Sequence, residues 1–249
     1  MSPSPISKTV FTQELPLSSG IATQWIIAGV ISSSARFIPI PLIDDSIQYR
    51  CRRYTVKKTL EAHQVKSSVN SLEPYFDNSL GQFKGCFGLI IKIPISLLLF
   101  PVRKLIAVVT AVRGVPLEVM RVYLLGRTLD RYLSENESTL ADHRLLLDDR
   151  SHAVRLRTAF DQAFVRMDMH MMLAVIRDAI GGFAEIRSAA MVGLKSVLVR
   201  KSESTESISL DSKVIEEAKR IQLSFSQTEM VALFDEFDQR FDRAMSDLL

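Results

Sequence analysis

The sequence contains few of the residues that form tight turns, cross-links or phosphate loops, with 10 glycines, 9 prolines and 2 cysteines in 249 residues. Cys51 and Cys86 lack the spacing of a metal or redox motif, so we expect two reduced thiols and no disulfide framework. No Gly-rich phosphate loop, G-x-S-x-G, H-E-x-x-H or C-x-x-C motif occurs. These absences favour a non-enzymatic protein over an enzyme, and we predict no cofactor and no metal site.

The alternation of β-branched and polar residues that is typical of strands is also scarce. Leu, Ala, Arg and Met recur instead at three- and four-residue spacing, hydrophobic residues make up 47% of the chain, and the mean hydropathy is +0.14. This pattern predicts an all-α protein, a helical bundle. The length allows one large domain or two small ones with an ample core.

Charge is distributed unevenly along the chain. Residues 1–134 hold 16 Lys and Arg against 8 Asp and Glu, whereas residues 135–249 hold 15 against 20. The basic part is also the more apolar part, a combination that suits an anionic lipid surface, where each basic residue contributes ~1 kcal/mol. Nucleic acid is a disfavoured partner, because its sites interleave basic residues with exposed aromatic residues or glycines.

The most informative stretch surrounds Pro39 and Pro41. It follows an apolar run without charge, residues 21–35. Because proline has no N–H and keeps the preceding residue extended, we expect a first helix that begins near residue 21 to stop near residue 37.

A second, basic helix is predicted from about residue 43 to residue 63. Asp44 and Asp45 suit its first turn, where carboxylates cap the backbone and meet the positive end of the helix dipole. The two helices form a proline-broken hairpin that is too interrupted for a straight membrane span. A hairpin that dips into one leaflet and a hairpin buried in a protein core fit the pattern equally well.

This stretch resembles a known protein family. The apolar helix, the segment Ile38-Pro39-Ile40-Pro41 and the acidic pair that opens a basic helix are similar to EcsC-like proteins and to related α-helical bacterial proteins. The likeness covers residues 21–58. It implies an α-helical protein near a membrane, and it implies no site residues, because the family offers no established catalytic positions to carry over.

A second apolar region, residues 86–112, repeats the order of apolar run, proline break and basic patch. Pro94 and Pro101 interrupt it, and a central Lys92 would cost ~3 kcal/mol in a transmembrane helix. We expect either an interfacial or re-entrant element, or a kinked core helix packed on the first hairpin.

The basic residues of both hairpins are the predicted membrane-surface contacts. They are Arg50, Arg52, Arg53, Lys57, Lys58, Arg103 and Lys104. Their long side chains can place cations among anionic headgroups while the apolar stems stay in the interface. The structural break that shapes the first hairpin consists of Pro39, Pro41, Asp44 and Asp45.

The chain divides into three regions: a flexible tail over residues 1–19, an apolar and basic helical region over residues 20–134, and an amphipathic helical region over residues 135–249. A loop is expected over residues 65–81. Pro116 is expected in the first turn of a helix that ends near residue 134.

The second region is predicted to contain four helices, one of them over residues 183–199 and rich in small residues. A long amphipathic helix should run from Thr139 to Gly181, and a shorter one from residue 211 to residue 223. A capping box from Ser226 to Glu229 should open the last helix. The apolar stripe of this helix consists of Val231, Phe234, Phe237, Phe241 and Met245. Such spacing is typical of core packing or of a homodimer seam, so self-association or a protein partner at this helix remains an alternative.

The histidines do not make a convincing metal site. Asp148 and His152 are spaced for one helix face, but metal sites need three or more ligands, so an exposed charge pair is preferred. His170 lies between Met167 and Met171, where adaptable core packing is preferred over a copper site.

The leading hypothesis is a non-enzymatic membrane-associated or scaffold protein at the cytoplasmic face of a membrane. The N-terminal residues lack the order of a signal peptide, which favours a cytoplasmic location. A soluble helical-bundle adaptor or homo-oligomer is the first alternative. A lipid-binding protein or an enzyme with an apolar cavity is the second.

Overall fold

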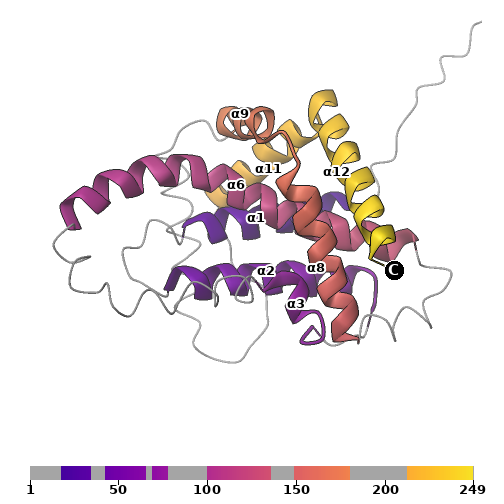
Figure 1. Cartoon of the computed structure of the whole chain (residues 1–249). Helices are drawn as coiled ribbons and strands as arrows, with labels where there is room; N and C mark the ends of the chain where they lie inside the picture. The colour runs from indigo at the N-terminus through magenta and orange to yellow at the C-terminus, as the bar shows by residue number, and fades with distance from the viewer. Residues whose placement is uncertain are drawn as a thin grey trace, which may run out of the picture.

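The computed structural model describes residues 18–34, 43–65, 69–77, 100–135, 149–179 and 212–248. Within these ranges the chain forms eight helices and no strand (Figure 1). The predicted all-α class is confirmed. The break residues Pro39 and Pro41 lie outside the described ranges, as does the predicted tail up to residue 17.

Helix α1 (Ser18–Ser34) occupies the centre of the molecule, in contact with α2, α6 and α11. A helix that is apolar on every side is stable in water only when it is buried on every side. Trp25 is 2% exposed and Val30 is fully buried. Of the two alternatives for the first apolar run, the structure shows the core helix.

Helix α2 (Ile43–Ala62) runs antiparallel to α1 and parallel to α6 (Phe100–Glu135). Its bounds agree with the predicted second helix. The indole Nε1 of Trp25 donates a hydrogen bond of 3.0 Å to the hydroxyl of Thr59, which ties the middle of α1 to the last turn of α2.

Two glycines allow α1 to approach α6 closely. A Cβ added at Gly29 would lie 2.9 Å from the Cα of Val119, and a Cβ added at Gly126 would lie 2.5 Å from the ring of Trp25. Both distances are shorter than packed carbon atoms allow, since their optimal separation is ~3.5–4.0 Å. The absence of a side chain at these positions therefore sets the spacing of the central helices.

The loop predicted after α2 contains a helical turn, α3 (Glu73–Phe76), which corrects that prediction. Pro74 lies in its first turn, where a missing N–H costs nothing. Tyr75 and Phe76 are 0% and 1% exposed, so burial of two aromatic rings stabilises a turn that its polar flanks did not predict.

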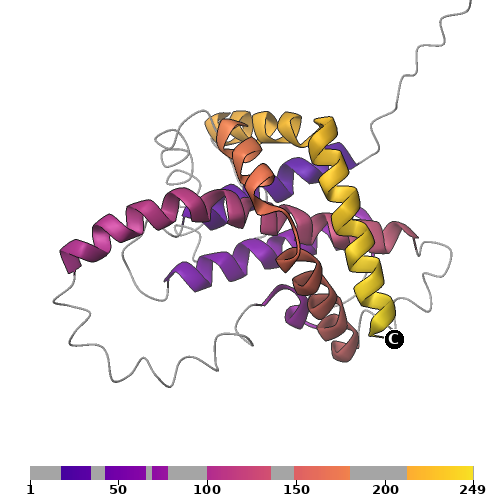
Figure 2. The same ribbon diagram turned by 45° about the horizontal axis from the view of Figure 1, so that its top comes forward.

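Pro116 lies inside α6 and does not begin a new helix, which is a second correction. An internal proline removes one backbone hydrogen bond and costs ~3 kcal/mol. The neighbouring Val115 and Val119 are 2% and 0% exposed, and this burial on both sides of the proline offsets the cost. At its N-terminal end α6 extends past α1 and α2 (Figures 1 and 2).

The predicted long helix of the second region is divided into α8 (Arg150–Val165) and α9 (Met169–Ala179). Each begins at an aspartate: the side chain of Asp149 accepts a hydrogen bond from the N–H of Ser151, and that of Asp168 accepts one from the N–H of His170. Capping of a new N-terminus by Asp168 explains why the apolar periodicity continues while the helix does not.

Helices α11 (Ser212–Phe225) and α12 (Thr228–Asp247) complete the described chain. The predicted capping box is wrong. Gln227 is the N-cap of α12 and makes no side-chain capping bond, while the hydroxyl of Ser226 donates to the carbonyl of Gln222 in the preceding helix.

The stripe of α12 packs inside the molecule. Phe234, Phe237 and Phe241 are 2%, 0% and 2% exposed, whereas Val231 is 43% exposed. Helix α12 lies beside α8, and both run across α6 (Figures 1 and 2). The phenylalanines therefore pack in the core of this chain, which is the first of the two interpretations of the stripe.

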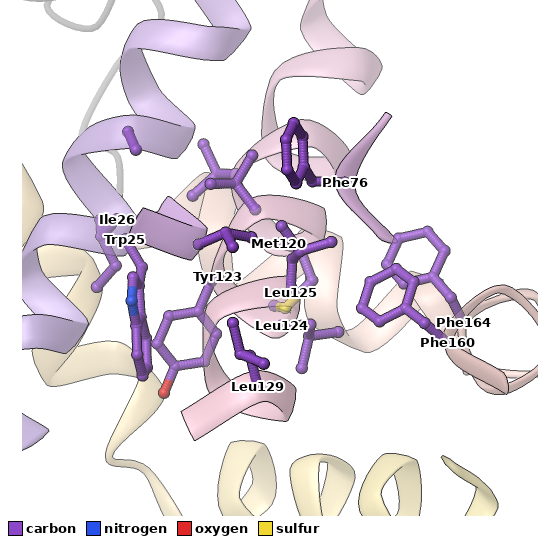
Figure 3. Packing of buried hydrophobic residues seen from close by; sticks show 14 of the residues in the cluster. Trp25, Ile26, Phe76, Met120, Tyr123, Leu124, Leu125, Leu129, Phe160 and Phe164 are labelled. Atoms are coloured by element: carbon purple, nitrogen blue, oxygen red, sulfur yellow. The ribbon is translucent and has the colours of Figure 1, made fainter. Parts of the chain in front are cut away.

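One core joins residues from both predicted regions. Tyr123 of α6 contacts Trp25, Phe225 and Phe234, with ring centres 5.9, 4.6 and 5.2 Å away. Figure 3 shows Tyr123 beside Trp25, with Phe160 and Phe164 on the opposite side of the cluster. Among the described helices, none has a stretch that is both long enough and apolar enough to cross a bilayer.

Candidate functional site

The outer face of α2 gathers four of the predicted membrane-surface residues. Arg50 and Arg53 are exposed, and the side chains of Lys57 and Lys58 are 37% and 32% exposed. With 3.6 residues per turn, positions 50, 53 and 57 lie on one side of the helix. We call these four residues the basic face of α2.

Within the part of the chain that the structure describes, the basic face has few carboxylate partners. Glu61 lies 2.7 Å from the Nζ of Lys58 and 3.6 Å from that of Lys57. The hydrogen bond with Glu61 raises the pKa of Lys58, and the same bond lowers the pKa of Glu61. Arg53 donates to the side-chain oxygen of Asn70, a neutral group. Among the described residues, Glu61 is the only carboxylate that forms an ion pair with these four cations, so the basic face keeps a positive surplus.

Arg52 is not part of this surface, which corrects its prediction as a membrane contact. It is 3% exposed, and its Nη2 lies 2.8 Å from the Oε1 of Glu118, which is 2% exposed. The hydroxyl of Ser32 donates to the same oxygen at 2.8 Å. The pair joins α1, α2 and α6 in the core.

The ionisation of Glu118 reflects a balance of two effects. Burial raises its pKa, but the charge of Arg52 and the hydrogen bonds from Ser32 and Arg52 outweigh burial, so the pKa lies below its usual value. Both groups of the pair are therefore charged, and each needs the other, because a lone buried charge is strongly unfavourable.

Cys51, next to the pair, is a buried free thiol. Burial, with a smaller contribution from the negative charge of Glu118, raises its pKa to about 12. The thiolate is the reactive form of cysteine, so this side chain is inert at neutral pH. Cys86 lies outside the described residues.

The remaining predicted residues are placed only in part. Arg103 and Lys104 lie in the first turns of α6. Asp44 and Asp45 lie in the first turn of α2, as predicted, and Asp45 is exposed.

Two histidines have partners that the sequence did not predict. The Nε2 of His63 lies 2.8 Å from a carboxylate oxygen of Asp130. The Nδ1 of His152 lies 3.2 Å from Nη2 of Arg155, and its Nε2 lies 2.9 Å from the hydroxyl of Tyr132. Because arginine only donates, Nδ1 accepts in this contact and Nε2 carries the proton that faces Tyr132.

No group of three side chains in the described ranges is placed to bind a metal ion. Asp148 lies outside those ranges, so its predicted pairing with His152 is not described. Met167 is 7% exposed, but Met171 is 40% exposed, which corrects its prediction as a core residue.

A ladder of ion pairs between α6 and α12 was also not predicted from the sequence. Arg127 lies 2.7 Å from Asp238, and Arg131 binds Asp242. Both arginines and both aspartates are four residues apart, and this shared spacing on two helices is the signal that could have revealed the ladder.

Comparison with protein-family models, with curated proteins and with solved structures finds no match to this chain. The resemblance to EcsC-like proteins therefore stays a prediction.

Proposed function

We propose that this protein is a peripheral, non-enzymatic helical module that docks on an anionic membrane at its cytoplasmic face, through the basic face of α2. The observation that carries the proposal is the basic face formed by Arg50, Arg53, Lys57 and Lys58, with Glu61 as its only ion-pair partner among the described residues. Anionic headgroups attract such clusters at ~1 kcal/mol per basic residue.

The burial of α1 supports docking at the membrane surface. Its apolar side chains, among them Ile26 and Val30 at 0% exposure, are already covered by other helices. The contact we propose is therefore electrostatic and lies at the surface, without insertion of the first hairpin. An interaction of this kind weakens with salt, because the Debye length shrinks from ~30 Å at 0.01 M to ~10 Å at 0.1 M ionic strength.

Co-sedimentation with lipid vesicles tests the proposal. The full chain should bind vesicles that contain phosphatidylglycerol, release them at high salt, and ignore vesicles of phosphatidylcholine alone. Arg50→Gln/Arg53→Gln removes two contacts of ~1 kcal/mol each, so the affinity should fall about 30-fold.

The matched control is Lys219→Gln/Arg243→Gln, which removes the same charge from exposed positions on α11 and α12. Its vesicle affinity should stay close to that of the wild type. An equal loss in both variants would mean that only net charge matters and would refute docking through α2. A wild-type chain that does not bind anionic vesicles at low salt would refute membrane docking altogether.

A further inference from the structure

The first turns of α6 project beyond the helices that cover the rest of it. Helix α1 runs antiparallel to α6, and its Gly29 packs against the backbone of Val119. Five further residues bring α1 to its end at Ser34. Because both helices rise by about 1.5 Å per residue, α1 reaches along α6 only to about position 114.

Helix α2 covers α6 slightly farther toward its start. It runs parallel to α6, and Arg52 lies opposite Glu118. The nine residues of α2 that precede Arg52 therefore reach to about position 109 of α6. Figures 1 and 2 show the start of α6 extending to the left of both helices, with no described helix beside it. We call residues 100–112 the projecting segment of α6.

The sequence of the projecting segment is amphipathic at helical spacing. With 3.6 residues per turn, its large apolar positions share one arc of about 120°. They are Val102, Leu105, Val108, Val109 and Val112. Arg103 and Lys104 lie on the opposite arc, together with Thr110. The apolar arc is the one that meets α1 farther along the helix, at Val119 and Gly126, so α1 no longer covers it in the projecting segment.

Charge indicates which surface this arc fits. Residues 78–117 contain five Lys and Arg and no Asp or Glu. A second copy of the chain would bring like charges together along the two helices, which is unfavourable. An anionic bilayer suits both arcs at once, because acyl chains accept the apolar positions while headgroups attract Arg103 and Lys104.

We propose that the projecting segment of α6 is an anchor that lies in the plane of an anionic bilayer, between its headgroups and its acyl chains. The proposal rests on the membrane docking proposed above and adds an apolar contact to it. Binding stays sensitive to salt, because the cations of both α2 and α6 take part. Pro116 allows the segment to turn toward the bilayer, since it removes the helical hydrogen bond to the carbonyl of residue 112, and helices bend at such positions.

Tryptophan fluorescence with vesicles of brominated phosphatidylglycerol tests the anchor. Trp25, the single tryptophan of the chain, is 2% exposed and lies in the core, so bromine in the acyl chains should not quench it. In Leu105→Trp the added emission should be lost on binding to brominated vesicles and kept on binding to vesicles without bromine. Val109→Trp serves the same purpose if Leu105→Trp does not fold. The control is Leu223→Trp on α11, where the native side chain is 73% exposed, and its emission should persist.

Vesicle affinity and stability give a second test. Leu105→Gln/Val109→Gln removes two apolar positions, so the affinity for phosphatidylglycerol vesicles should fall at least about tenfold. The matched control, Leu223→Gln/Val231→Gln, changes the same residue types at exposed positions on α11 and α12 and should leave the affinity unchanged. In urea without lipid, both double variants should unfold close to the wild-type midpoint. A large loss of stability in Leu105→Gln/Val109→Gln alone would indicate a kinked core helix and refute the anchor.

The outcomes separate the anchor from docking through α2. If Arg50→Gln/Arg53→Gln weakens vesicle binding but neither added tryptophan of α6 is quenched, the anchor is refuted and docking through α2 stands. If both are quenched while Arg50→Gln/Arg53→Gln binds as well as Lys219→Gln/Arg243→Gln, the anchor stands and the basic face of α2 is refuted. A wild-type chain that does not bind anionic vesicles would overturn both proposals.

Discussion

Arg52 and Glu118 lie almost fully out of water, and replacing one of them should destabilise the protein far more than replacing both. Glu118→Leu leaves the Arg52 guanidinium, 3% exposed, without the carboxylate that lies 2.8 Å away. Removing one partner of a buried pair costs about 3–5 kcal/mol. For a chain of this size the melting temperature should fall by about 10 °C.

The double variant Arg52→Met/Glu118→Leu should behave differently. It replaces both charges with apolar side chains of similar length, and such exchanges are often neutral or stabilising. The hydroxyl of Ser32 loses its acceptor, but a serine in a helix can turn to a backbone carbonyl of the preceding turn. We expect the double variant to lie within about 1 kcal/mol of the wild type, so the two substitutions should be strongly non-additive.

Urea unfolding, monitored by the circular dichroism of the helices, gives the free energies of unfolding of the wild type, the two single variants and the double variant, which together form a double-mutant cycle. The pH dependence of the free energy of unfolding gives an independent test. The folded pKa of Glu118 lies below its ordinary value of 4.5, so its stabilisation is complete above that pH and is lost as the pH falls through the folded pKa. The double variant should lack this acid-dependent loss. Additive single effects, or the same acid loss in the double variant, would refute the role assigned to the pair.

Two further predictions concern the packing of the same helices. Gly126→Ala should lower the free energy of unfolding by about 1–3 kcal/mol, because the added methyl group would lie 2.5 Å from the ring of Trp25. The control is Gly20→Ala, where nothing lies within 4 Å of the added Cβ, so the free energy of unfolding should stay unchanged or rise. Equal effects of the two substitutions in urea unfolding would contradict the close contact between Gly126 and Trp25. The thiol of Cys51, with a pKa of about 12, should resist iodoacetamide at pH 8 in the folded chain and react after unfolding. Peptide mass spectrometry measures the labelling, and rapid labelling of the folded chain would contradict the burial of Cys51.

The sequence predicted the ends of helices well where neighbouring capping and polar residues pointed to the same boundary. The bounds of α2 followed from Asp44 and Asp45 at its start and from the polar residues after residue 62. The end of α6 at Glu135 followed from the polar stretch beyond it. Both ends are decided by residues within one turn, which is why the sequence alone could locate them.

The wrong predictions arose where distant contacts decide. Proline at position 116 breaks an isolated helix, and only the tertiary packing around Val115 and Val119 keeps α6 continuous. The turn of α3 depends on the burial of Tyr75 and Phe76 among residues far along the chain. Helix propensity is a weak guide to secondary structure when the burial of such side chains contributes several kcal/mol.

The candidate site was predicted in part, and its main error was avoidable. Arg52 lies two residues after Arg50, about 200° around the helix, and so faces the side opposite to the basic face. Helical spacing alone places it on the buried arc with Thr55 and Val56, which are both fully buried.

The central position of α1 also affects how the chain is synthesised. The hydroxyl of Thr23 on α1 donates to Gln222 on α11, a partner 199 residues away. A ribosome that adds ~5–20 residues per second needs about 10–40 s to complete the partners that cover this helix. During that interval a charge-free apolar segment is exposed, in the state in which chains aggregate most readily. Until those partners are complete, nascent α1 needs protection by a chaperone or by the ribosome surface.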